Sequence, residues 1–180
     1  MKYAALAAAA PAALLLAGCV TAGGETSQAL SGDLAASGYV EELYVSAAPD
    51  AGISADFAAK MQETLREALD ECATGDRPLR LDVDLQTVKY PNPIQSAVMT
   101  DTAAVTGAVT LYDLETSETA GQYMIEREVR GGLGAGGAVM MSVMADRQIR
   151  GGFAEEICVR AFGAEPQSLM RNVEDDPDSE

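Results

Sequence analysis

The glycines at 132, 134 and 137 match the spacing G-x-G-x-x-G, between a predicted strand and a predicted helix. Glycines so placed let backbone N–H groups approach the pyrophosphate of a dinucleotide. Here the match comes late in the chain, where no following βαβ unit can complete a nucleotide-binding half. The chain is also strongly acidic, and its apolar N-terminal stretch predicts export to a compartment with little free nucleotide. We therefore interpret Gly132–Gly137 as a glycine-rich crossover.

The absence of histidine excludes most other common arrangements of catalytic residues. Without it the chain has neither the usual general base at neutral pH nor the commonest metal ligand. We therefore expect no enzyme activity, no catalytic residues and no metal site. Pairs of neighbouring charged residues are common in a chain with 28 acidic residues. We therefore expect the pairs on predicted elements to be exposed to solvent: Asp82 with Asp84, Glu155 with Glu156, and Arg147 with Arg150.

The thiols of Cys72 and Cys158 lie on two predicted helices that should cover the same face of a sheet. In an oxidising compartment they form a disulfide on one interpretation. On the other they are two buried free thiols. The chain has no C-x-x-C motif, so thiol–disulfide catalysis is not expected.

The N-terminus predicts a membrane-anchored precursor. Lys2 precedes an apolar stretch, Ala4–Leu16, of the length of a signal-peptide core and too short to span a bilayer. The stretch ends in Leu16-Ala17-Gly18-Cys19, which resembles the lipobox of bacterial lipoproteins. We expect cleavage before Cys19 and acylation of this residue with diacylglycerol and an N-acyl chain, with no other cofactor. An ordinary secretory cleavage site is the alternative.

The folded elements are predicted between residues 39 and 163. Alternation of apolar and polar side chains indicates strands at 39–46, 79–85, 103–113 and 122–130, and its shift at Val88 and Tyr90 suggests a bulge before Pro91. Apolar residues at steps of three and four indicate helices at 54–72 and 145–161. The order β-α-β-β-β-α predicts an α+β domain: a four-stranded, mostly antiparallel sheet with both helices on one face. The expected core includes Phe57, Leu65, Leu81, Val83, Val109, Leu111, Phe153 and Ile157.

The segments outside this domain differ in composition. Residues 1–18 are the predicted signal peptide, residues 19–38 a lipidated flexible tether rich in small residues, and residues 164–180 a disordered acidic tail. The formal net charge of −16 disfavours nucleic acid and anionic lipid headgroups as partners.

An uncharged stretch, Leu133–Ala145, contains Met140, Met141 and Met144. Methionine adapts to irregular apolar partners, so these side chains are candidates for a partner-binding surface. Packing in the core, at the start of the last helix, is the alternative. The loop 91–102 carries a second apolar group of Ile94, Val98 and Met99.

Three sequence segments carry a resemblance to a loose class of bacterial envelope lipoproteins: LRLDVDLQTV, VTGAVTLYDLETSETAGQYMIE and MADRQI. This class comprises auxiliary lipoproteins of ABC-type lipid transport, the lipopolysaccharide-assembly lipoprotein, and related alphaproteobacterial domains of unknown function. The resemblance implies a non-enzymatic component of an envelope assembly or lipid-transport system. Aspartate after the acylated cysteine often retains such proteins in the inner membrane. Here that position is Val20, which favours the inner leaflet of the outer membrane, with the domain facing the periplasm.

The leading hypothesis is therefore a lipid-anchored accessory protein that binds an envelope protein or lipid. A periplasmic lipoprotein that binds a small apolar or cationic ligand is the second hypothesis, and a nucleotide-dependent enzyme using the glycine run is the third.

Overall fold

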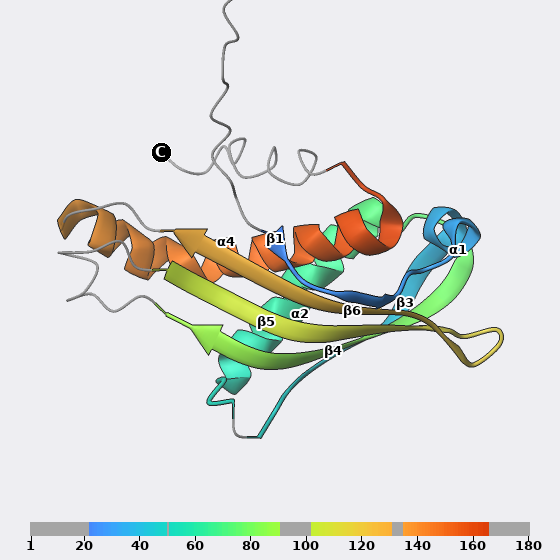
Figure 1. Cartoon of the computed structure of the whole chain (residues 1–180), viewed down its shortest axis with the longest axis horizontal. Helices are drawn as coiled ribbons and strands as arrows, with labels where there is room; N and C mark the ends of the chain where they lie inside the picture. The colour runs from blue at the N-terminus through green and yellow to red at the C-terminus, as the bar shows by residue number, and fades with distance from the viewer. Residues whose placement is uncertain (1–21, 50, 91–101, 131–134, 166–180) are drawn as a thin grey trace, which may run out of the picture.

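One mixed sheet forms the framework of the domain (Figure 1). The computed structural model describes residues 22–49, 51–90, 102–130 and 135–165. The four long strands lie in the order β6-β5-β4-β3, and only the β3–β4 pair is parallel. Their bounds are Gly38–Ala47 (β3), Arg77–Lys89 (β4), Thr102–Asp113 (β5) and Glu118–Arg130 (β6). The predicted mixed α+β architecture with a mostly antiparallel sheet is thus confirmed in outline.

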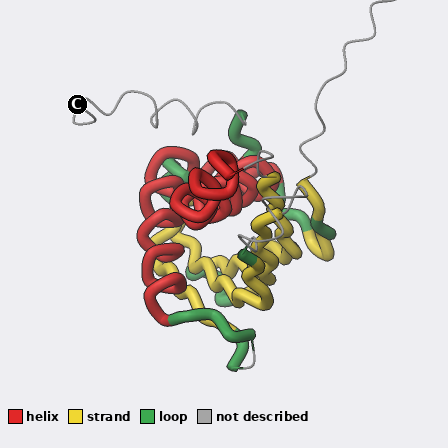
Figure 2. Tube along the Cα trace, turned by 90° about the vertical axis from the view of Figure 1, so that its left-hand side faces the viewer, coloured by secondary structure: helices red, strands yellow, loops and turns green. Residues whose placement is uncertain are grey.

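Two long helices, α2 (Ala55–Cys72) and α4 (Ala135–Phe162), cover one face of this sheet (Figure 2). The hydroxyl of Ser54 accepts a hydrogen bond from the Phe57 N–H at 3.1 Å, which caps the start of α2. Helix α4 ends at Phe162 because Gly163 adopts a φ of +69° and its N–H bonds back to the Val159 carbonyl. None of the helices in the described ranges has the length and hydrophobicity needed to span a membrane.

The core lies between the helices and the sheet. All eight residues expected there are buried, with Leu65, Leu81, Leu111 and Phe153 fully inaccessible to solvent. Gly107 on β5 leaves room for the Phe153 ring, whose Cζ would lie 3.0 Å from an added Cβ. The register of β4 against β5 shifts between Leu85 and Thr87, a few residues before the bulge predicted at Val88 and Tyr90.

The segment before β3 differs from its prediction. Residues 19–38 were expected to form a flexible tether, but from residue 22 onward they are folded: β1 (Ala22–Gly23), β2 (Thr26–Gln28) and α1 (Gly32–Ser37). Both short strands pair antiparallel with the outer edge of β6, so the sheet has six strands in the described residues rather than the predicted four. The prediction was wrong because small polar residues lack a hydrophobic pattern, whereas the pairing uses backbone groups that β6 supplies.

Contacts with β6 hold this N-terminal strap, residues 22–30, in place. The Met124 N–H donates to the Glu25 carbonyl at 2.7 Å, and the Leu30 N–H donates to the buried Tyr123 hydroxyl at 2.6 Å. Gly24 adopts a φ of +150°, and an added Cβ there would lie 2.1 Å from the Met124 carbonyl oxygen. Only glycine therefore permits the strap to approach β6 this closely.

Two further boundaries differ from the prediction. Helix α4 begins ten residues earlier than the expected start at residue 145, and β6 begins at Glu118 rather than at residue 122. Helix α4 continues through a glycine-rich sequence, and antiparallel pairing with β5 extends β6 through a polar one. Beyond Glu165 the predicted acidic tail lies outside the described residues.

Candidate functional site

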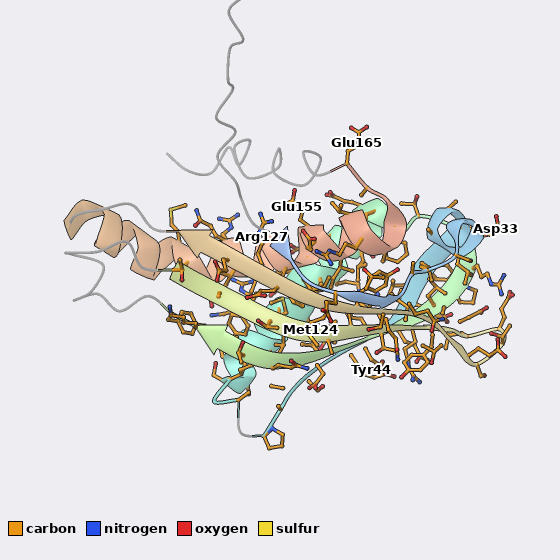
Figure 3. The ribbon with its side chains drawn as sticks, in the orientation of Figure 1. Asp33, Tyr44, Met124, Arg127, Glu155 and Glu165 are labelled. Carbon is orange, nitrogen blue, oxygen red and sulfur yellow. A yellow bond between two sulfur atoms is a disulfide. The ribbon has the colours of Figure 1, made fainter. Side chains whose placement is uncertain are left out.

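The face of the sheet opposite the helices is the strongest candidate for a functional surface. Strand alternation directs Leu43, Leu81 and Val109 toward the helices, so their neighbours along each strand point to the other side. No described helix or strand covers that side, which we call the open sheet face. It is built mainly of small, hydroxyl-bearing and charged residues, with Tyr44 on β3 and Met124 on β6 toward its two sides (Figure 3).

A shallow depression of about 380 Å³ lies on the β3–β4–β5 part of the open sheet face. Its rim includes the Tyr44 ring, which is 56% exposed and therefore available for contact. The remaining lining residues are Ser46, Arg80, Asp82, Val83, Asp84, Ala108 and Thr110. A depression this open suits contact with part of a larger molecule better than enclosure of a small one.

Arg80 is held in place within the depression. Its Cζ lies 4.3 Å from the centre of the Tyr112 ring, and its Nε lies 3.1 Å from the Asp82 Oδ1. The cation–π contact and the ion pair fix the guanidinium between the two partners. Nearby, the Ser46 hydroxyl donates to the exposed Asp84 carboxylate at 3.3 Å. The arrangement presents an ordered aromatic and acidic surface.

The open sheet face carries an excess of negative charge. Among the side chains that the structure describes, register and alternation assign the following charged residues to it: Glu42, Asp82, Asp84, Glu126 and Glu128 as acids, with Arg80 and Lys89 as bases. Because like charges repel, this surface favours a cationic partner over an acidic one.

The glutamates of α4 are not the solvent-exposed pair that was predicted. Glu155 and Glu156 are each only 8% exposed. Glu155 lies 3.8 Å from the Arg127 Nη2 of β6, and Glu156 accepts a hydrogen bond from Arg160 one turn further along α4. Burial raises the pKa of Glu155, against the opposing effect of Arg127. For Glu155 the prediction failed because the paired arginine comes from a distant strand. The Arg127–Glu155 pair joins β6 to α4, and the Arg160–Glu156 pair lies within α4.

Arg150 also differs from its prediction as a surface charge. Its guanidinium donates to the Thr64 hydroxyl at 2.6 Å and to the Lys60 carbonyl at 3.2 Å, which joins α4 to α2. The same group pairs with Asp146, whose carboxylate also accepts the Tyr90 hydroxyl at 3.1 Å. Burial raises the pKa of Tyr90 to about 12. Arg147, by contrast, is exposed as expected.

The remaining candidates from the sequence are distributed as follows. Cys72 and Cys158 are joined in a disulfide between α2 and α4. Met144 is 38% exposed on α4; the side chains of Met140 and Met141, on the same helix, lie outside what the structure describes. Cys19 and the loop residues Ile94, Val98 and Met99 lie outside the described residues.

The glycine run is not part of a nucleotide-binding unit in the described ranges. Residues 131–134 lie outside them, and Ala135, Gly136 and Gly137 belong to α4. A βαβ unit needs parallel strands on both sides of its helix. Strand β6 is antiparallel to β5, and α4 is the last element described, up to residue 165.

Tyr44, Arg80 and Tyr112 were not singled out from the sequence. Each lies on a strand between residues that point into the core, so alternation alone would have placed all three on the opposite face. Which face stays uncovered depended on both helices packing on the same side. Among the described residues, no group of three or more acidic or cysteine side chains is arranged to hold a metal ion.

No family model and no curated protein matches this chain. Solved structures with a similar fold include two crystal forms of PelC from Paraburkholderia phytofirmans, each described as a dodecamer. The first has a TM-score of 0.51 at 9% identity, covering 78% of this chain and 99% of PelC; the second has 0.50 at 9%, covering 78% and 98%. A candidate lipoprotein from Caulobacter crescentus CB15 has a TM-score of 0.43 at 12% identity, covering 67% and 85%. At these identities the likeness to PelC establishes a shared fold and nothing about function.

Proposed function

We propose that this protein is a non-catalytic, lipid-anchored component of the bacterial envelope that binds a protein partner through its open sheet face. The lipobox ending at Cys19 would supply the anchor, and valine at position 20 favours the inner leaflet of the outer membrane, with the domain facing the periplasm. An accessory role in an envelope assembly or lipid-transport system follows from the resemblance to envelope lipoproteins.

The observation that carries the binding role is the uncovered sheet face with its exposed Tyr44. An aromatic ring beside a fixed Arg80–Tyr112 pair is typical of interface contacts, where Tyr and Arg are enriched. The acidic surroundings define the partner as a protein with a basic contact surface.

Site-specific photo-crosslinking in intact envelopes tests this role. A photoreactive residue at Tyr44 should give an adduct with a defined partner, whereas one at exposed Glu67 on α2 should not. Neutralising Asp82 and Asp84 together (Asp→Asn) should reduce the adduct at position 44 by about tenfold, as expected for lost charge pairs of about 1.4 kcal/mol in total.

The matched control neutralises Glu67 and Asp70, two exposed acids of α2, and should leave the yield unchanged. An equal loss of adduct in both double variants would mean that the net charge of the protein, rather than the open sheet face, determines binding. Because PelC is described as a dodecamer, the same gel is examined for adducts between two copies of this chain. Such adducts at position 44 would identify a second copy as the partner.

The depression favours one alternative, the binding of a small cationic ligand beside the exposed Asp84 carboxylate. Native mass spectrometry of the protein purified from envelopes distinguishes the two functions. A bound small cation that Asp84→Asn removes would support the ligand, and its absence together with a Tyr44 adduct would support the protein partner.

A further inference from the structure

We infer that the N-terminal strap holds the β1–β6 edge of the sheet directly at the membrane surface, so that the domain meets the lipid headgroups edge-first. This inference rests on the proposed acylation of Cys19, and it adds which surface of the domain faces the membrane.

The first step is the length of chain between anchor and domain. Cys19 precedes Ala22, the first residue of β1, by three positions. Even fully extended, three residues reach only about 11 Å. A flexible tether through residue 38 would instead place the domain about 24 Å away on average. The folded strap therefore replaces a long connection with a very short one.

The second step is that the strap cannot readily detach. Ala22 and Gly23 pair with Arg127 and Glu126 of β6. The Met124 N–H donates to the Glu25 carbonyl, and the Leu30 N–H donates to the Tyr123 hydroxyl. Leu30 is buried in the core, which fixes the far end of the strap. Release would leave these hydrogen bonds unmade and expose the Leu30 side chain.

The third step is the position of β1 within the sheet. β1 lies at one edge and β3 at the other, four strand spacings or about 19 Å apart. Arg127 and Glu155 lie close to β1, and Tyr44 lies well away from them (Figure 3). An added Cβ at Gly24 would lie 3.0 Å from the Arg160 Nη1, so the strap also touches α4. The membrane-facing surface therefore comprises the strap, the outer side of β6 and the neighbouring side of α4.

Charge indicates that the short connection, rather than attraction to headgroups, brings this surface to the membrane. The arginines beside the strap, Arg127 and Arg160, are engaged by Glu155 and Glu156. The chain as a whole carries −16, which anionic lipid repels. The arrangement is thus expected to persist at high salt.

Fluorescence quenching by headgroup-nitroxide lipid tests the inference. The acylated protein is reconstituted in vesicles of phosphatidylethanolamine with a minor share of phosphatidylglycerol. A single fluorophore is attached to a cysteine introduced at Glu126, opposite Gly23 on β6, or at Tyr44 on β3. Both positions are exposed, and the native cysteines are acylated or disulfide-bonded. Quenching should be at least twofold stronger at position 126, at low and high salt.

Two perturbations should abolish this difference. One inserts about twelve Gly/Ser residues between Val20 and Thr21, which lengthens the connection. The other is Gly24→Ala, which forces the strap away from the Met124 carbonyl without adding residues. Gly32→Ala is the matched control, because an added Cβ there meets nothing within 4 Å. Equal quenching at positions 126 and 44 in the parent protein would overturn the inference and leave the anchor intact. Failure of the mature chain to associate with vesicles at all would overturn the proposed function itself.

Discussion

The Cys72–Cys158 disulfide is predicted to supply a large part of the stability of the domain. The bond connects α2 to α4 across a sequence separation of 86 residues. Closing a loop of that size in the unfolded chain removes conformational entropy equivalent to about 4.6 kcal/mol at 25 °C. For a domain of this length, the same free energy corresponds to a fall in melting temperature of roughly 15 °C.

The measurement compares the oxidised and reduced forms of the Cys19→Ser mature chain in guanidinium chloride. Reduction retains both sulfur atoms, so it creates no cavity, and the difference reports the covalent link alone. Because the link acts mainly on the unfolded chain, reduction should slow refolding and change the unfolding rate little. Identical midpoints for the two forms would refute the reasoning.

Four further predictions address the core, the strap and two buried carboxyl groups. Leu65→Ala, at a fully buried position of α2, should lower the free energy of unfolding by about 2–5 kcal/mol in denaturant titration. Gly24→Ala should increase amide hydrogen exchange in residues 22–30 while leaving exchange in the central strands unchanged. Burial raises the pKa of the Glu155 carboxyl, so its protonated form stabilises the fold. This stabilisation is present below the pKa of the group in the unfolded chain and is lost as the pH rises through its pKa in the folded protein. Glu155→Gln should remove this loss of stability with rising pH. The hydrogen bond from Arg77 lowers the pKa of the Asp113 carboxyl, so its ionised form stabilises the fold. This stabilisation is lost as the pH falls through the pKa of the folded protein. Asp113→Asn should therefore reduce the fall in the free energy of unfolding at acid pH.

The sheet and the two long helices could be predicted because their information is local. Leu79, Leu81, Val83 and Leu85 alternate with polar residues along β4, and only one face of the strand is buried. Ser54 and the apolar steps of α2 define the start and the buried side of that helix. In each case the pattern of apolar residues along the chain predicts which side chains are buried.

The strap and the burial of Glu155 could not be predicted because the partners of these residues are distant in sequence. Residues 22–28 have no apolar period, and their order comes from the free edge of β6 about a hundred residues later. Glu155 is buried because Arg127 lies across from it, beside the space left by Gly152, where an added Cβ would lie 2.5 Å from the Arg127 Nε. A sequence of charged residues gives no indication of such pairing.

Only part of the candidate site, the open sheet face, could be predicted from the sequence. Alternation placed Asp82 and Asp84 on one face of β4, and the same argument extends to Tyr44 and Tyr112 on the adjacent strands. The sequence also predicts both helices on the other face of the sheet, so an uncovered face was expected. The contact of Arg80 with Tyr112 was not expected, because it depends on the register of β4 against β5.

The measurement that tests the central claim most directly is the mass of the N-terminal peptide of the mature protein isolated from membranes. The account predicts a chain that begins at Cys19 and carries a diacylglycerol group and an N-acyl chain, with Cys19→Ser leaving an unlipidated precursor outside the membrane fraction. A mature N-terminus at any other residue, or an unmodified Cys19 in membrane-associated protein, would contradict the lipid anchor and with it the proposed function.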